Sequence, residues 1–374
     1  MKRFKLSQLM DGLLPVFATL AALAVGAVML LVLGANPIQA YGALIEGAFG
    51  SGNALAETAA KAVPLLLVGL GICISFRANV INIGGEGQMI IGAILGTVVG
   101  LALTGGPGWM VIPLGLLAGF VGGAFWGAIP GALKAYFNVN EILSTVMMNA
   151  IAVQIMNYLL RGPLIDPAQA ELASQIPQTA PLDIAFRLPR LVPTRLHLGA
   201  AIAIALAILV YILLWRTTLG YRIRAVGQNP DASRYGGIRV RRQVVIALLL
   251  SGAFAGLAGV TQVYGLNYRM ITDGSATGFT GSAGFNGIVA ALFGQLHPIG
   301  AIPASFFFGA LLVGANKLQR VMQVPSAFIT ALNGLVVVFV VSSDIWRRRR
   351  QRRRQIEATQ KAEAEPALAA QLEV

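Results

Sequence analysis

Long apolar runs, separated by short polar or charged stretches, occupy the chain from residue 13 to residue 346. A run of about 20 apolar residues can cross the hydrocarbon core of a bilayer as a helix. The pattern therefore predicts an all-α polytopic membrane protein with about ten transmembrane helices. Two runs, 62–76 and 283–296, are too short to cross as straight helices, which is typical of broken or re-entrant segments. The predicted spans are residues 13–34, 62–76, 80–103, 109–131, 139–160, 197–215, 243–266, 283–296, 299–316 and 325–346.

Positive charges gather at three places, each next to an apolar run. The chain is 56% hydrophobic and only 11% charged, yet its net charge is +13. The clusters lie in the N-terminal segment 1–12, in the segment 216–242 and in the arginine run 347–354. The positive-inside rule explains this placement better than nucleic-acid binding does, so we expect both termini in the cytoplasm and no nucleic-acid partner. In this arrangement Lys317 and Arg320 fall outside and go against the rule.

Glycine and other small residues recur at regular spacing in the apolar runs. The stretch GGEGQMIIGAILG (84–96) loosely resembles GFNGIVAALFG (284–294), which predicts two loosely related halves. In SGAFAGLAGV (251–260), small residues stand four positions apart. This spacing allows neighbouring transmembrane helices to approach closely.

Residues that could carry catalysis or bind a metal are scarce. The single cysteine is Cys73, and the two histidines, His197 and His297, stand alone at the expected membrane boundaries. We therefore predict no metal site and no catalytic residue. No lysine follows a glycine, so a P-loop for ATP is absent from the sequence. Apart from Glu86 and Glu141, the spans carry almost no ionisable residue, which favours a passive pathway powered by another subunit.

The basic segment 216–242 contains start and stop signals for a short helix. Asn229 can cap its N-terminus, Pro230 suits the first position, and two glycines can end it. A helix of about two turns is unstable alone in water, so it requires a partner surface. The alternative is a solvated basic loop that only sets topology. The predicted docking helix comprises Asn229, Pro230, Asp231, Ala232, Ser233, Arg234, Tyr235, Gly236 and Gly237.

One carboxylate, Glu86, lies among glycines inside an apolar run, six residues after Val80. That spacing corresponds to a depth of about 9 Å if the segment is helical. Because a helix is easily unwound at glycines, we expect the carboxylate to accept hydrogen bonds from free backbone N–H groups of this bend. A proton carrier or a substrate ligand is the alternative. The predicted structural brace consists of Asn82, Gly84, Gly85, Glu86 and Gly87.

Five longer stretches together resemble a known family. They are NVINIGGEGQMIIGA (79–93), NVNEILSTVMMNAIAVQIMNYLLRGPL (138–164), GYRIRAVGQNPDASRYGGI (220–238), LSGAFAGLAG (250–259) and GFNGIVAALFGQLHPIGAIPASFFFGAL (284–311). The chain resembles ABC importer permeases of the ribose and branched-chain amino acid superfamily. Within it, the likeness is strongest to nucleoside and simple-sugar permeases that work with basic-membrane-protein lipoproteins.

The resemblance implies a subunit of the bacterial inner membrane that works by alternating access. It implies cytoplasmic ABC ATPase subunits, which bind ATP and Mg, and no cofactor on this chain. It also implies a second permease subunit, a homologous but different chain, an extracytoplasmic substrate-binding lipoprotein and surrounding membrane lipids. The expected regions are a cytoplasmic N-terminus (1–12), a transmembrane permease domain (13–346) with a coupling loop (216–242), and a cytoplasmic basic run with a disordered tail (347–374).

The resemblance favours nucleosides as substrates. Simple sugars of the ribose or galactose type and branched-chain amino acids are alternatives, and a secondary carrier or channel is a further one. An aromatic ring and amides can stack on and hydrogen-bond a nucleobase or ribose, although the amides can equally bond neighbouring helices. The candidate residues of the translocation path are Asn149, Gln154, Asn157, Phe285 and Asn286.

Overall fold

In the computed structural model, the described residues form helices joined by non-helical loops. The described residues are 6–324 and, after them, only positions 328, 331, 332, 334–336, 338, 339 and 342. Contacts divide the chain into two units, one formed by residues 1–43 with 318–374 and the other by residues 44–317. The arginine run 347–354 and the tail lie outside the described residues, as does most of the predicted span 325–346.

The first unit contains helix α1 (Leu6–Val32) and the start of α2 (Pro37–Phe49). The two helices are bent by 119° at the break between them. The hydroxyl of Tyr41 donates a hydrogen bond to the carbonyl of Leu23, which fixes α2 against α1.

The second unit holds most of the helices that are long and apolar enough to cross a membrane. Among the described residues there are seven such helices, or eight if the bent α1–α2 pair forms one span. The seven are α3 (Gly52–Arg77), α4 (Gly85–Ala102), α5 (Gly108–Phe137), α6 (Glu141–Arg161), α8 (Gly199–Arg216), α11 (Val240–Gln262, continued by the π-helical turn η2, Val263–Asn267) and α14 (Pro298–Met322).

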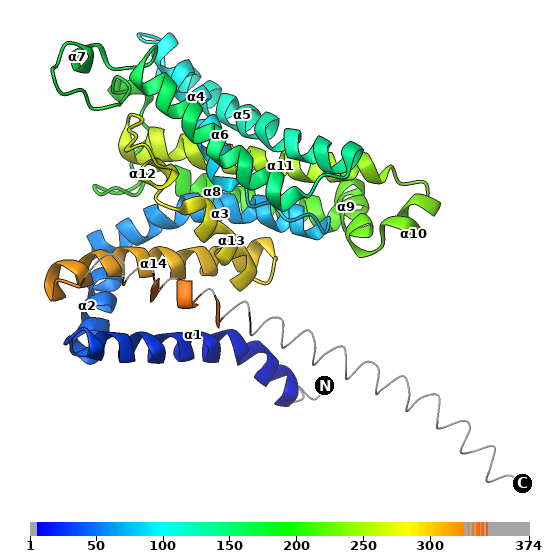
Figure 1. The fold of residues 1–374 in the computed structure, drawn as a ribbon, viewed down its shortest axis with the longest axis horizontal. Coiled ribbons are helices and arrows are strands. Elements are labelled where there is room, and N and C mark those ends of the chain that lie inside the picture. Colours follow the sequence, from blue (N-terminus) through cyan, green and yellow to red (C-terminus); the bar gives the residue numbers. More distant parts are fainter. Residues whose placement is uncertain are drawn as a thin grey trace, which may run out of the picture. The chain divides into compact units, whose positions relative to one another are not determined.

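Short helices connect these spans. They are α7 (Pro167–Ala170), the 3₁₀ turn η1 (Ile184–Phe186), α9 (Thr218–Gln228), α10 (Pro230–Tyr235), α12 (Ala276–Thr280) and α13 (Ala283–Phe293). As Figure 1 shows, α9 and α10 lie at the end of the bundle where α11 begins, whereas α7 lies at the opposite end.

The prediction that segment 62–76 is too short to cross was wrong. This segment belongs to the 26-residue helix α3, which begins at Gly52 after the capping residue Ser51. Thr58 lies in the part of α3 before residue 62, and its buried hydroxyl donates to the carbonyl of Ala48 at 3.1 Å, so this polar residue fits inside the helix. The second short segment is confirmed as short, because α13 has 11 residues.

Close glycine contacts join α4, α5 and α11, which run side by side in Figure 1. A Cβ atom added at Gly256 of α11 would lie 2.8 Å from the Cα atom of Gly123 in α5 and would overlap the carbonyl of Gly119. A Cβ atom at Gly92 of α4 would overlap the backbone of Gly256. The close approach predicted from the small residues of segment 251–260 is thus confirmed.

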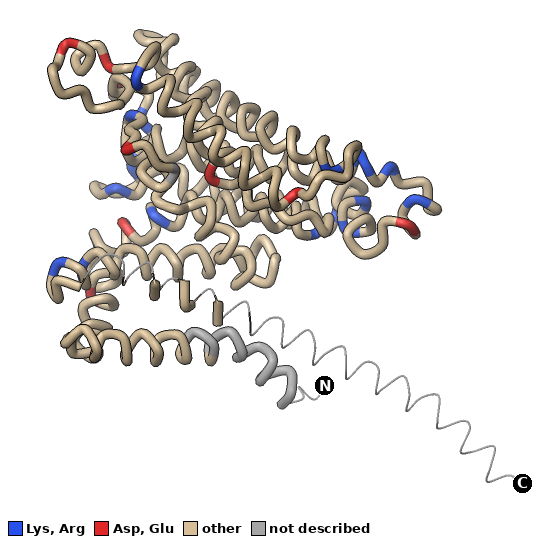
Figure 2. The backbone as a smooth tube through the Cα atoms, in the orientation of Figure 1, with Lys and Arg blue, Asp and Glu red and all other residues tan. Residues whose placement is uncertain are grey.

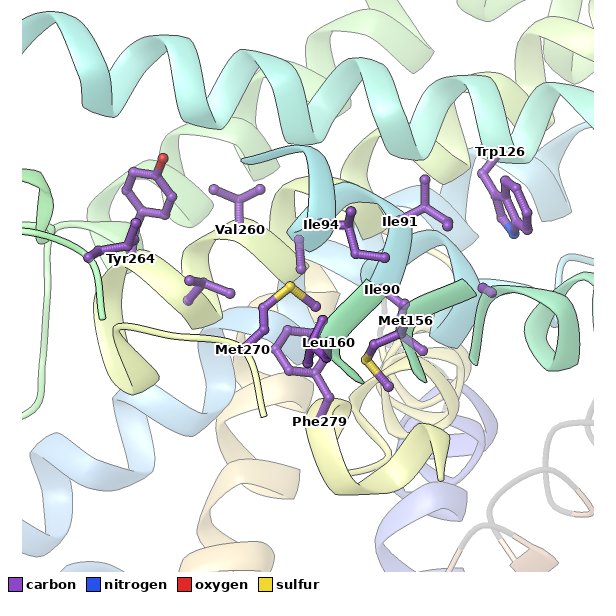
Figure 3. Close-up of a cluster of buried hydrophobic side chains, with 14 of the residues drawn as sticks. Ile90, Ile91, Ile94, Trp126, Met156, Leu160, Val260, Tyr264, Met270 and Phe279 are labelled. Carbon is purple, nitrogen blue, oxygen red and sulfur yellow. The ribbon is translucent and has the colours of Figure 1, made fainter. Parts of the chain in front are cut away.

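A buried apolar cluster lies beside these glycine contacts. Figure 3 shows side chains from α4, α5, α6, α11 and the following segments meeting there. Tyr264 is fully buried and donates from its hydroxyl to the carbonyl of Gly96 at 2.8 Å. The labelled members are Ile90, Ile91, Ile94, Trp126, Met156, Leu160, Val260, Tyr264, Met270 and Phe279.

These contacts predict that Gly256→Ala lowers the stability of the protein. The new methyl group must displace the backbone of α5, and overpacking of this kind costs about 1–3 kcal/mol of the free energy of unfolding. Thermal unfolding of the purified protein in detergent measures the change. Gly52→Ala is the matched control, because an added Cβ atom there meets nothing within 4 Å. Equal stability of the two variants would contradict the packing role of Gly256.

Candidate functional site

The short helix predicted in the segment 216–242 is present as α10, with the expected signals at both ends. The side-chain oxygen of Asn229 accepts hydrogen bonds from the backbone N–H groups of Asp231 (3.0 Å) and Ala232 (2.9 Å). After the last helical residue, Gly237 adopts φ = +78°, a left-handed conformation that suits glycine. The sequence therefore contained the local information for this helix.

A second helix, α9, precedes α10 and was not predicted. It begins after Thr217, whose hydroxyl accepts a hydrogen bond from the N–H of Gly220 at 3.2 Å. Ile223 and Val226 are buried on one side of α9. The sequence signal for α9 was a capping threonine followed by apolar positions three apart. The arginines on either side of Ile223 obscured that signal.

The surface around α9 and α10 is strongly basic. Figure 2 shows Lys and Arg gathered at this end of the bundle. Asp231 forms an exposed ion pair with Arg234 at 3.8 Å. Tyr235 is 95% exposed. An almost fully exposed tyrosine on a short, protruding helix is the kind of side chain that anchors protein–protein interfaces.

Inside the bundle, Asn82 fixes the non-helical loop that leads into α4. Its side-chain oxygen accepts a hydrogen bond from the N–H of Gly84 at 2.9 Å. Its amide nitrogen donates to Gln88 Oε1 of α4 at 3.0 Å and to Ser251 Oγ of α11 at 2.8 Å. All three side chains are buried. Asn82 thus ties the loop to two helices.

Asn149 of α6 holds the same loop from the other side. Its side-chain oxygen accepts from the N–H of Gly87 at 2.8 Å, and its amide nitrogen donates to the carbonyl of Ile83 at 2.9 Å. This candidate path residue therefore uses both ends of its amide on neighbouring backbone. No residue near Asn149 in the chain indicates a pairing with Gly87, which stands 62 positions earlier.

Glu86 joins α4 to α13 rather than bonding to its own bend. The N–H groups of Gly84 and Gly87 are bound by the two asparagines. Glu86 is only 1% exposed, and its Oε1 atom accepts a hydrogen bond from the N–H of Phe285 at 3.1 Å. Phe285 is the third residue of α13, whose preceding residue, Ser282, makes no side-chain cap. The glutamate supplies that cap from a distant part of the chain.

The N-termini of α4 and α13 meet at this carboxylate. A Cβ atom added at Gly85 would lie 3.2 Å from the Cα atom of Gly284 and 3.4 Å from Val68 of α3. Val68 stands nine residues before Arg77, the last residue of α3, so this contact lies about 14 Å along α3 from its end. The depth of about 9 Å expected for Glu86 assumed a helical rise from Val80. That assumption does not hold, because the backbone up to Gly84 is not helical. Both helices begin beside the side chain of Glu86, whose Oε1 atom serves as an acceptor for the start of α13.

The other candidate path residues do not form one compact site. Asn157 donates to the carbonyl of Gly274 at 3.2 Å and accepts from the hydroxyl of Thr272 at 2.8 Å. Gln154 is exposed on α6, and Asn286 is half-buried. The side chain of Phe285 is 45% exposed.

The two histidines lie beside helix starts. His197 is buried just before α8, and its Nδ1 atom accepts from the N–H of Gly199 at 3.1 Å. Burial lowers its pKa to about 4, which keeps the ring neutral at physiological pH. His297 packs beside the rings of Tyr211 and Trp215. Within residues 6–324, no three histidine, cysteine or acidic side chains gather as metal ligands would.

Comparisons with known proteins identify a matching family and several relatives. A family model described as "Branched-chain amino acid transport system / permease component" matches residues 54–341. The guanosine ABC transporter permease protein NupP of Bacillus subtilis is 36% identical over 88% of this chain and 93% of its own length. The glucose ABC transporter permease protein TsgB13 of Haloferax volcanii is 34% identical over 90% of this chain and 88% of its own. A second guanosine permease of Bacillus subtilis, NupQ, is 29% identical over 78% of this chain and 91% of its own. No solved structure matches.

The geometry at Glu86 predicts different outcomes for two substitutions. Glu86→Gln keeps an oxygen that accepts from Phe285, so stability and solute uptake are expected to remain largely intact. Glu86→Leu leaves that partly buried N–H without its acceptor, which costs about 1–3 kcal/mol of the free energy of unfolding. Thermal unfolding in detergent and uptake into reconstituted vesicles measure the two effects. Complete loss of uptake in Glu86→Gln, with normal assembly, would instead indicate an ionic role.

Proposed function

This chain belongs to the family of permease components of branched-chain amino acid transport systems and is the permease subunit of an ABC importer of the cell membrane; from this premise we propose that it imports nucleosides. The observation that carries this proposal is the similarity to a permease named for guanosine, which extends over nearly the whole chain. Simple sugars remain the second candidate, because a permease named for glucose is almost as similar. Branched-chain amino acids, named in the family description, come third.

The family assignment also bears on the secondary carrier or channel as an alternative to an ABC permease. A permease component is a transport subunit without a catalytic role of its own. The secondary carrier or channel that the sequence left open is set aside, because members of this family work with an ATPase. In this proposal, ATP and Mg bind to that ATPase rather than to this chain.

We propose about ten membrane spans, with both termini on the cytoplasmic side of the inner membrane. The basic surface of α9 and α10 is expected on that same side. In this arrangement, residues 1–12 and 347–374 flank a permease domain at 13–346.

The proposal of two related halves is supported by one shared feature. In each half, a non-helical segment leads to a helix N-terminus, and the two N-termini meet at Gly85 and Gly284.

We propose that α10, within the coupling loop 216–242, docks onto the ATPase and transmits its motion. A capped, exposed helix at the basic end of the bundle suits a groove on a partner protein. The partner permease is expected to be a homologous but different chain, because this chain resembles both NupP and NupQ of one bacterium. An extracytoplasmic lipoprotein would deliver the substrate at the opposite end.

The proposed translocation path uses Gln154, Phe285 and Asn286 as the side chains offered to the solute. An exposed aromatic ring such as that of Phe285 can stack on a nucleobase. Asn149 and Asn157 would support the path by fixing the two loops that border it. In this proposal, Glu86 braces the path without touching the solute.

The coupling role of α10 predicts that Arg234→Glu weakens binding of the cognate ATPase roughly tenfold, because it reverses a charge on the docking helix. Asp231→Lys, on the same helix, is expected to act in the same direction. Co-purification from detergent followed by an affinity titration measures the loss. Arg161→Glu, at the other end of the bundle, is the matched control and should bind normally. Unchanged affinity in both α10 variants would contradict the assignment.

Uptake assays test the substrate. Vesicles that contain the permease pair and the ATPase, supplied with the lipoprotein and ATP, should accumulate labelled guanosine. Excess adenosine or uridine should compete, whereas glucose, ribose and leucine should not. Competition by a sugar or by leucine, with none by nucleosides, would replace the nucleoside proposal. Full uptake without the ATPase would contradict the ABC mechanism.

A further inference from the structure

A basic groove lies behind the proposed coupling helix. Its volume is about 780 Å³, and it is formed by α9, α10 and the first turn of α11. Among the described residues, no aspartate or glutamate lines it. Residues that define its character are Tyr221, Arg222, Gln228, Arg239, Arg242 and Gln243.

Three arginines converge on this groove from two parts of the chain. Arg222 comes from α9, whereas Arg239 and Arg242 stand at the start of α11, and all three are exposed. In the part of the chain that the structure describes, no carboxylate forms an ion pair with any of them. Asp231, the only acidic residue of the coupling loop, pairs with Arg234 instead.

The floor of the groove carries a polar group that is also without a partner. Gln243 is 3% exposed, and its Oε1 atom has no hydrogen-bond partner among the described residues. Buried polar atoms are normally paired. The positive-inside rule explains why arginines lie on this side of the membrane, but it does not require them to converge on one hollow without a counter-charge.

We propose that this groove receives an acidic surface element of the ATPase subunit. The inference rests on the proposed docking of α10, because residues of α10 also line the groove. Arginine pairs with carboxylates through two parallel hydrogen bonds, so three arginines suit a short acidic segment.

The two proposed contacts, α10 on the ATPase and an acidic element of the ATPase in the permease groove, have different mechanical effects. A helix seated in a groove of the ATPase transmits a push when the ATPase subunits close. An acidic element of the ATPase held in a groove of the permease transmits a pull when they separate. The two contacts together couple the permease to both strokes of the ATPase cycle.

Zero-length cross-linking tests the contact in the assembled transporter. Arg222→Lys and Arg242→Lys place an amine in the groove, and a carbodiimide then joins it to any carboxylate in contact. The expected product is a peptide of this chain linked through residue 222 or 242 to an aspartate or glutamate of the ATPase. The matched control is Arg241→Lys, whose position lies outside the groove and whose guanidinium rests on the ring of Tyr136. A link from the control alone, or none from the groove, would overturn the proposal.

Binding measurements separate this inference from the proposed function. The double variant Arg222→Gln/Arg242→Gln should bind the ATPase roughly tenfold more weakly and with less dependence on salt. If Arg234→Glu weakens binding and the double variant does not, only the groove inference fails. If the wild-type permease does not bind the ATPase, the proposed function fails with it. If the double variant loses co-purified anionic phospholipid but keeps its ATPase affinity, the groove binds lipid headgroups and the proposal is wrong.

Discussion

Backbone hydrogen bonding around the start of α4 is the constraint on which this bundle depends. Among membrane-spanning helices, non-helical backbone is tolerated only where its N–H and C=O groups find partners within the protein. Asn82 binds the N–H of Gly84, and Asn149 binds the N–H of Gly87 and the carbonyl of Ile83. These bonds, with that of Glu86, fix α6, α11 and α13 around one point of the chain.

Those bonds require helices whose backbones lie unusually close, and the glycines make that possible. The contact between Asn82 and Ser251 spans 2.8 Å, which demands that the start of α4 stay near α11. Farther along α4, Gly92 meets Gly256 without an intervening side chain. Without a hydrophobic driving force between helices in lipid, such close packing and interhelical hydrogen bonds are the main sources of association. The polar and glycine contacts therefore reinforce each other.

Features set by neighbouring residues were predictable from the sequence, and features set by distant ones were not. Most of the long helices followed from apolar length, although α3 begins at Gly52 rather than at residue 62. Helix α10 followed from Asn229 and the glycines after it, because capping is local. The partner of Glu86 was misplaced, since nothing near it in the chain indicates Phe285. For the same reason, the partners of Asn149 in and beside the loop before α4 could not be named from the sequence. The roles of α10 and of Gln154, Phe285 and Asn286 in transport remain proposals.

The hydrogen bond between Glu86 and Phe285 also bears on how the protein is made. The two residues stand 199 positions apart. At 5–20 residues per second, the ribosome completes Glu86 about 10–40 s before Phe285. Asn149, 62 residues after Gly87, arrives much sooner. The early helices thus enter the membrane while α13 does not yet exist, and α4 reaches its final hydrogen-bonded state only late in biogenesis.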